Sequence, residues 1–168
     1  MKNFFLLAIL ALNLFAFDTN FKTFKSDFTQ TVKSINSSIN YEGYFVLTPS
    51  KAFWSYERPT NKQIYINNKD VTIIENDLEQ VIYTSLDKIP NLSIIFKNAK
   101  KKSDTEYETQ YDGILYKIIL QNDEIKQVSY KDDFDNTVII ELKNQQRNIS
   151  LNNDIFKARI PSNYDVLK

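Results

Sequence analysis

Short apolar and β-branched runs recur along the chain, and clusters of polar residues separate them. Six of the runs are KQIYI (62–66), DVTII (70–74), EQVIY (79–83), ILYKIIL (114–120), KQVSY (126–130) and TVIIEL (137–142). The separators are Asn67-Asn68, Asn76-Asp77, Asp112-Gly113, Asn122-Asp123, residues 132–136 and Asn152-Asn153. Asn and Asp tolerate a left-handed backbone, which matters in a chain with only two glycines. This pattern predicts a mainly β, antiparallel meander that forms a sandwich or a barrel.

Helical spacing is found in two places. After Asp18, which could cap a helix, four apolar residues recur at helical spacing: Phe21, Phe24, Phe28 and Val32. We therefore expect an N-terminal helix, although DFTQTV (27–32) also alternates as a strand with Phe28, Gln30 and Val32 on one side. The segment NLSIIFKNAKK (91–101) predicts a short helix after Pro90, with Leu92, Ile95 and Phe96 on one face and lysines at its end. The fold class is then α+β, a large sheet with two or three helical pieces.

The run AFWSYERPTNKQIYI (52–66) has aromatic residues on both faces of its predicted strands. By alternation, Trp54 and Tyr56 share one face, while Phe53 points the other way. An ordinary core explains any single aromatic residue. Their density in one pair of strands indicates in addition a hydrophobic cavity that binds something.

The start of the chain differs from the rest. Lys2 precedes the apolar run FFLLAILALNLFAF (4–17), which is too short to span a bilayer, and Ala16 is a small residue suited to cleavage. We predict a secretory signal peptide at residues 1–16 and a single domain at residues 17–168; the alternative is a buried N-terminal helix.

Without Lys2 the chain has 20 basic and 21 acidic residues, which gives no excess of positive charge for binding nucleic acid. Cysteine is absent, so disulfides and lipidation are excluded, and we expect a soluble protein in the periplasm.

Histidine is also absent, which removes most common catalytic and zinc-binding arrangements. The densest acidic cluster, KDDFDN (131–136), lacks the glycine and distal glutamate of a calcium loop and lies between two predicted strands. We interpret it as a solvated hairpin turn, and we read Asp77 and Glu79 in the same way. We expect no enzyme, metal or cofactor; a hydrolase using Asp132 or Asp133 is a remote alternative.

Several segments resemble the LolA family of periplasmic lipoprotein carriers in their order and spacing. FKSDFTQTV (24–32), YEGYFVLTPSKAFWSYERP (41–59) and QIYINNKDVTIIENDLEQV (63–81) carry most of the resemblance, including Gly43, Pro49, Trp54, Tyr56 and Pro59. VIIELKNQQRN (138–148) and IFKARIPSNYDV (155–166) are similar to the family's C-terminal part.

The resemblance implies an unclosed antiparallel β-barrel, or half-barrel, with a lid of short helices over a hydrophobic cavity for acyl chains. The cavity residues expected from the match are Phe45, Trp54, Tyr56, Ile64, Ile66, Ile73, Leu92 and Ile95. The implied function is a monomeric carrier that takes acylated lipoproteins from an inner-membrane lipoprotein-releasing ABC transporter to the outer membrane, where a receptor is a further partner. A periplasmic lipid or lipoprotein sensor on the same fold is the alternative.

One position departs from the family pattern. Many members have Arg before the proline that is Pro49 here, and that Arg holds the lid closed, whereas this chain has Thr48. A hydroxyl donates one hydrogen bond and a guanidinium up to five. Thr48 is therefore the expected lid-locking position. Either Thr48 holds the closed lid more weakly than Arg would, or another residue, Lys51 or Arg58, holds it instead.

Overall fold

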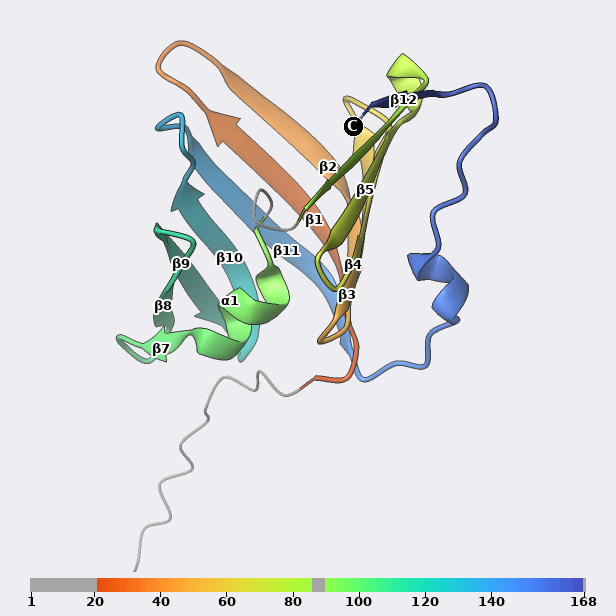
Figure 1. Ribbon diagram of the computed structural model, residues 1–168. Coiled ribbons are helices and arrows are strands. Elements are labelled where there is room, and N and C mark those ends of the chain that lie inside the picture. The colour runs from red at the N-terminus through yellow and green to blue at the C-terminus, as the bar shows by residue number, and fades with distance from the viewer. Residues whose placement is uncertain (1–20, 86–89, 168) are drawn as a thin grey trace, which may run out of the picture.

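A computed structural model describes residues 21–85 and 90–167, and its main feature is one large, curved β-sheet (Figure 1). The predicted signal peptide at residues 1–16 lies outside the described residues. Within them the strands are β1 Phe24–Lys33, β2 Ser38–Leu47, β3 Lys51–Arg58, β4 Lys62–Asn67, β5 Asp70–Glu75, β6 Gln80–Ser85, β7 Lys100–Lys101, β8 Glu106–Tyr111, β9 Ile114–Gln121, β10 Glu124–Lys131, β11 Thr137–Arg147 and β12 Asp165–Leu167. The helical pieces are α1 Leu92–Asn98 and two short 3-10 helices, η1 Asn76–Leu78 and η3 Asn153–Phe156.

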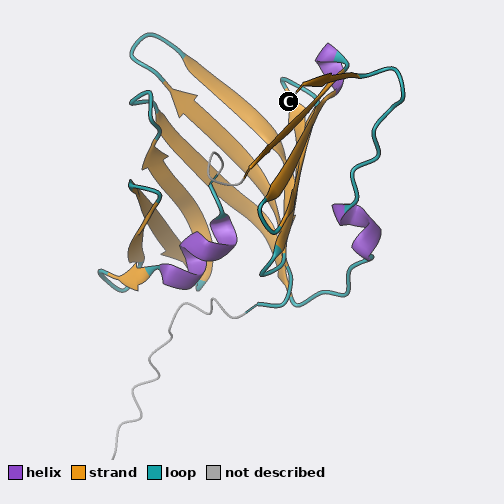
Figure 2. Cartoon of the chain, viewed as in Figure 1, coloured by secondary structure: helices purple, strands orange, loops and turns teal. Residues whose placement is uncertain are grey.

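The twelve described strands form one sheet in the order β12-β6-β5-β4-β3-β2-β1-β11-β10-β9-β8-β7. All neighbours are antiparallel except β12, which adds to the edge of β6 in parallel. The sheet does not close on itself. It bends around its middle strand β1, so that β3–β5 and β8–β10 face each other with α1 between them (Figures 1 and 2). The mainly β architecture predicted from the residue pattern is confirmed, and so is the unclosed sheet implied by the family resemblance.

Six predicted strands and their turns are found where the pattern placed them. The turns use the residues expected, because Asn68, Asp112, Asn122, Asp123 and Asp135 all have positive φ. At Asn122 and Asp123 two successive positive φ values join β9 to β10 as a tight hairpin, the geometry that matches the twist of antiparallel strands.

The predicted N-terminal helix is wrong, because residues 24–33 form the central strand β1. Phe24, Phe28 and Val32 are spaced by four, and four is a multiple of the two-residue period of a strand, so they also share one face of a sheet. β1 pairs with β2 along its whole length and with β11 on its other side. This two-sided pairing and the burial of Phe24 and Phe28 decide in favour of a strand.

The bend of the sheet has local causes in the strands. The ladders shift register between Lys25 and Asp27 and between Glu42 and Gly43, near the middle of the sheet. Such bulges bend and twist a strand. At the first of them Ser26 is fully buried, and the main-chain carbonyls of Asp27 (2.8 Å) and Lys143 (2.9 Å) both lie within hydrogen-bonding distance of its hydroxyl, whose single proton they compete for or share. The polar group that the bulge buries is thus satisfied.

The aromatic residues that point away from the Trp54 face lie on the convex face of the sheet. Val46, Phe53, Tyr65, Ile74 and Val81 form a cluster there, which the C-terminal segment covers with Phe156 of η3. Figure 2 shows η3 on the side of the sheet away from α1. Asn67 donates to the carbonyl of Phe156 (3.3 Å) and Tyr164 to Asn76 (3.0 Å), which tie this segment to the strands.

Candidate functional site

The concave face of the sheet carries a continuous apolar ladder. The cross-strand partners Ile82, Ile73, Ile64, Trp54 and Phe45 line up from β6 to β2. Alternation places these side chains on the face opposite to Phe53 and Tyr65. Burial increases inward along the ladder, since Ile82 and Ile73 are partly exposed and Phe45 is fully buried. The ladder leads from β6, the strand next to the edge strand β12, into the centre of the sheet.

Aromatic rings pack at the inner end of the ladder. Trp54 contacts Phe45 with ring centroids 4.6 Å apart and Phe28 at 5.2 Å, and it stacks on Tyr56 at 6.3 Å. Phe24 extends the group and meets Phe96 of α1 edge to face at 6.0 Å. Such pairs contribute about 0.5–1.5 kcal/mol each beyond their area burial. The interior is therefore well packed in this state.

Helix α1 covers this interior, as the sequence predicted for residues 91–101. It begins after Asn91, whose side chain accepts from the Ile94 amide, and it ends at Ala99. The buried residues Leu92, Ile95 and Phe96 follow the i, i+3, i+4 spacing of one helix face. Within the described residues α1 is the one α-helix, so the several short helices expected over the concave face are reduced to one.

The space left between α1 and the sheet is small. A cavity of about 50 Å³ is lined by Gln30, Trp54, Tyr56, Ile64, Pro90, Leu92, Tyr130 and Ile140. Binding pockets for small molecules usually enclose about 300–1,000 Å³. The interior is thus closed here, and an elongated apolar ligand requires α1 or one half of the sheet to move.

All eight cavity residues expected from the sequence belong to this interior. Phe45, Trp54, Ile64, Ile66, Leu92 and Ile95 are buried in its cluster, and Tyr56 and Ile73 pack against it. Four of them line the small cavity itself: Trp54, Tyr56, Ile64 and Leu92. The sequence reasoning missed Gln30 and Tyr130, although Gln30 lies in the alternating run 27–32 that also predicted a strand.

The cavity has a polar end formed by tyrosines and one glutamine. The Tyr56 hydroxyl donates to the side-chain oxygen of Gln30 (2.9 Å), and the Lys62 ammonium lies 4.8 Å from the centre of the Tyr56 ring. Burial raises the pKa of the Tyr56 phenol well above its usual value, and the nearby Tyr130 and Tyr41 add to this effect. The hydroxyl consequently stays protonated at neutral pH.

Thr48 contacts α1 through its backbone. The Ser93 hydroxyl of the helix donates to the Thr48 carbonyl (3.0 Å), while the Thr48 hydroxyl accepts from the Lys51 amide (2.9 Å) within its own turn. Lys51 lies over the Phe156 ring on the convex face, and Arg58 pairs with Glu42. The side chains of Thr48, Lys51 and Arg58 thus make their described contacts away from α1.

The acidic cluster at residues 131–136 is the hairpin turn that the sequence predicted. The Asp132 carboxylate accepts from the amides of Phe134 (3.0 Å) and Asn136 (2.9 Å) and from the Asn136 side chain (3.0 Å). Asp135 pairs with Lys131 at 3.0 Å. These carboxylates are used to hold a turn between β10 and β11.

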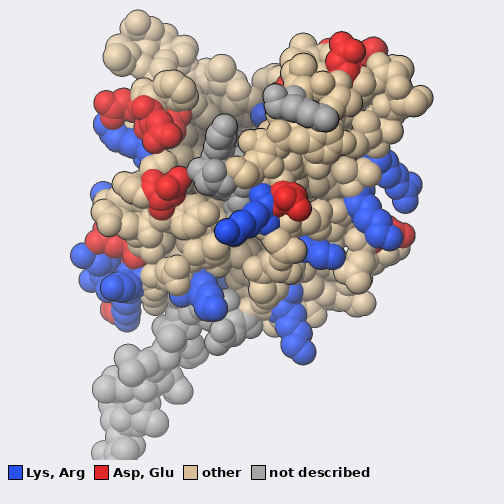
Figure 3. Space-filling view, in the orientation of Figure 1, with Lys and Arg blue, Asp and Glu red and all other residues tan. Residues whose placement is uncertain are grey.

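The charges of the chain are interspersed. Figure 3 shows basic and acidic side chains scattered over the same face of the molecule, and the formal net charge of the chain is +0. The same view shows the molecule hollowed at its top, between the β1–β2 hairpin and the β5–β6 connection. None of the helices in the described part of the chain has the length and hydropathy needed to cross a membrane.

The family model and the similar proteins found by comparison all point to the same family. Residues 19–159 match a family model described as "Outer membrane lipoprotein carrier protein LolA". An outer-membrane lipoprotein carrier protein of Campylobacter jejuni is 50% identical over 167 residues, which is 99% of both chains. A protein of the same description from Helicobacter hepaticus is 32% identical over 163 residues, covering 95% of this chain and 90% of its own.

Solved structures support the same fold at low sequence identity. A LolA superfamily protein from Nitrosomonas europaea superimposes with a TM-score of 0.55 at 10% identity, covering 83% of this chain and 91% of that one. An uncharacterized conserved protein from Thermus thermophilus gives a TM-score of 0.54, also at 10% identity, over 89% of this chain and 91% of that one.

Proposed function

The chain belongs to the LolA family, and from this premise we propose that it carries lipoproteins released from the inner membrane through the periplasm to the outer membrane. The observation that carries the proposal is the continuous apolar interior between the concave face and α1, which spans both halves of the sheet. The role is transport and not catalysis. The secretory signal peptide that the sequence predicts at residues 1–16 supports the proposed location.

In this proposal the acyl chains of the cargo occupy the interior. The ladder from Ile82 to Phe45 offers an apolar path from β6 to the centre of the sheet, and the hollow between the β1–β2 hairpin and the β5–β6 connection is the proposed entrance (Figure 3). The cavity of about 50 Å³ is the collapsed form of the site. Helix α1 is the lid, because its apolar face fills the space that an acyl chain would take.

Closure of the empty interior competes with the cargo, and this competition makes delivery feasible. Burying an acyl chain of about sixteen carbons is worth about 13 kcal/mol, at about 0.8 kcal/mol per CH₂. Burying the three apolar side chains of α1 is worth about 5–9 kcal/mol, at about 1.5–3 kcal/mol each. The net affinity for a chain is the difference between such terms, so the cargo is held without being trapped.

The lid needs a latch that is weak enough to open. The Ser93–Thr48 hydrogen bond joins α1 to the turn between β2 and β3, at the position where many family members have Arg. A single neutral hydrogen bond contributes about 0.5–1.5 kcal/mol. We propose that this backbone contact holds the closed state in place of a guanidinium.

The proposed partners are acylated lipoproteins, an inner-membrane lipoprotein-releasing ABC transporter that hands them over, and a receptor at the outer membrane. The carrier acts as a monomer. Depletion of the protein in its own bacterium, followed by separation of the two membranes, tests the role. Lipoproteins destined for the outer membrane should accumulate in the inner membrane, and unchanged sorting after depletion would refute the carrier role.

A further inference from the structure

The small cavity is lined by residues of two chemical kinds. Trp54, Ile64, Leu92 and Ile140 give it apolar walls, and Gln30, Tyr56 and Tyr130 give it hydrogen-bonding groups. The polar residues come from β1, β3 and β10, and therefore from both halves of the sheet. An apolar site with a few convergent polar groups is built for a ligand with one apolar and one polar part.

Two donor groups among the polar lining residues have no hydrogen-bond partner within the described residues 21–85 and 90–167. The Gln30 oxygen accepts from Tyr56, but neither the Gln30 amide nitrogen nor the Tyr130 hydroxyl bonds to another residue among those that the structure describes. Both side chains are only half-buried, so these groups reach open space. They can donate to a bound molecule without breaking an existing hydrogen bond.

Tyr130 remains a donor under all ordinary conditions. Burial, followed by the negative charge of Asp132, raises the pKa of the Tyr130 phenol to about 12. A protonated phenol and a carboxamide are neutral donors, and they suit an uncharged acceptor such as a carbonyl oxygen.

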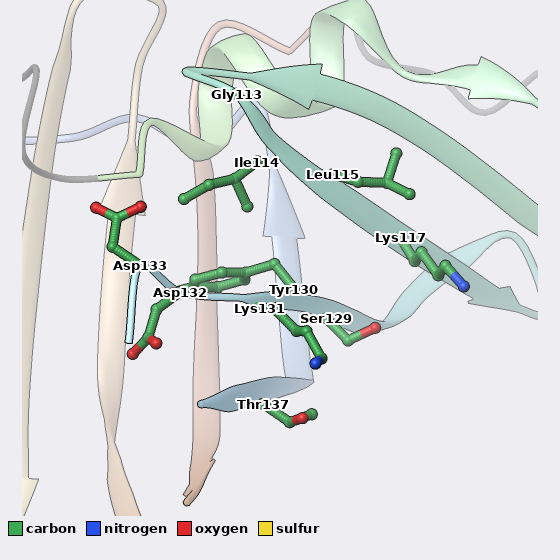
Figure 4. A pocket seen from close by; sticks show the side chains of 10 residues that line it. All are labelled: Gly113, Ile114, Leu115, Lys117, Ser129, Tyr130, Lys131, Asp132, Asp133 and Thr137. Atoms are coloured by element: carbon green, nitrogen blue, oxygen red, sulfur yellow. The ribbon is translucent and has the colours of Figure 1, made fainter. Parts of the chain in front are cut away.

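Tyr130 also borders an opening to the surface. A groove of about 610 Å³ lies where β9 and β10 diverge beyond the last paired residues, Lys117 and Ser129. Figure 4 shows the Tyr130 ring just below Ile114, with Asp132 and Asp133 at the same end of the groove. A ligand that contacts Tyr130 can thus have its apolar chains inside the cavity and its remaining part outside, in the groove.

We propose that Gln30 and Tyr130 donate hydrogen bonds to the ester and amide carbonyl oxygens that attach the acyl chains to the head of the cargo. This inference rests on the carrier function proposed above. The carbonyl is the polar atom at the head of an acyl chain, and the apolar wall of Trp54, Ile64 and Leu92 begins beside the two donors. β1 and β10 lie on either side of β11, and Gln30 and Tyr130 reach the same small cavity from these two strands. The pair fixes how far the chains enter.

The test compares two soluble probes of equal chain length. One is a synthetic triacylated lipopeptide with ester-linked chains and an N-terminal amide-linked chain; the other is its trialkyl counterpart, with ether linkages and an N-alkyl group. Dissociation constants are measured by competition with a fluorescent fatty acid, for the wild type, Tyr130→Phe and Gln30→Met. Tyr65→Phe is the matched control, because its hydroxyl bonds to Gln63 and its ring lies in the cluster on the convex face.

Tyr130→Phe and Gln30→Met should each weaken binding of the acyl probe about three- to tenfold, the range for one neutral hydrogen bond. Binding of the alkyl probe should stay the same, and Tyr65→Phe should affect neither probe. Equal loss for both probes, or no loss for either, would overturn the carbonyl contacts while leaving the carrier function intact. If the wild type binds neither probe, the proposed function is refuted, and this inference is refuted with it. Circular dichroism of each variant confirms that it folds.

Discussion

Replacing Gly43 by alanine tests how closely strands β2 and β3 are packed. Gly43 lies in β2 at a register shift, opposite Phe28 of β1 and Tyr56 of β3. A Cβ atom at this position would lie 1.9 Å from the Ser55 carbonyl oxygen and 2.9 Å from the Ser55 carbonyl carbon. Both are backbone atoms, so no side-chain rotation can relieve the clash.

The size of the effect follows from this geometry. Real Cβ atoms essentially never approach closer than 3.0 Å, so the strands must part by at least 1.1 Å, the difference between 3.0 and 1.9 Å. Overpacking of this kind costs about 1–3 kcal/mol and occasionally more, and the neighbouring ladder hydrogen bonds are strained in addition. We expect a loss of about 3 kcal/mol, which lowers Tm by roughly 6–12 °C in a chain of this length.

Urea unfolding followed by circular dichroism measures the change, and Gly113→Ala is the control. Gly113 also has no side chain, but a Cβ there meets nothing within 4 Å, and its φ of +76° is the main obstacle to alanine. That conformation costs about 1 kcal/mol for a residue other than glycine. The reasoning is refuted if Gly43→Ala loses less than about 1 kcal/mol, or no more than Gly113→Ala.

Three further perturbations address the lid, the convex face and the buried phenols. Ser93→Ala removes the hydrogen bond to Thr48, and amide hydrogen exchange in residues 92–98 should become about two- to tenfold faster; an unchanged rate would show that this bond does not hold the helix. Phe156→Ala should cost about 3–5 kcal/mol and expose the C-terminal segment to limited proteolysis, and full resistance would contradict its packing against the sheet. Burial raises the pKa of the Tyr130 phenol from 10.0 to about 12, so this phenol ionises at lower pH in the unfolded chain than in the folded protein. The free energy of unfolding should therefore fall as pH rises from about 10 to 12, and it should fall less in Tyr130→Phe. An equal fall in the wild type and the variant would show that other groups cause it.

Local signals in the sequence were enough to predict much of the sheet. Runs rich in β-branched residues and the Asn and Asp turns between them placed six strands, because both depend on the residues themselves. The amphipathic pattern after Pro90, with lysines at its end, likewise predicted α1, although the Asn91 cap was seen only in the structure. The error at residues 24–33 arose where the local pattern fits both periods, and only pairing with the distant β11 decides between them.

The proposed binding interior was harder to predict than the fold. Alternation placed Trp54 and Phe53 on opposite faces, but the sequence does not reveal that residues 151–164 return to cover Phe53 and leave the Trp54 face for the interior. Tyr130 is brought beside Gln30 and Tyr56 by the curvature of the whole sheet, and no local motif encodes that distance. The family resemblance supplied the concave site where residue patterns alone could not.

The central claim, that acyl chains bind on the concave face, is tested most directly at two consecutive isoleucines of β5. Ile73 packs against the interior cluster, whereas Ile74 lies in the cluster on the convex face. A photoreactive leucine analogue is placed at one position or the other, and each protein is irradiated with a radiolabelled triacylated lipoprotein. The account predicts cross-linking of the lipid from position 73 and none from position 74. Equal cross-linking from both positions, or cross-linking from position 74 alone, would contradict it.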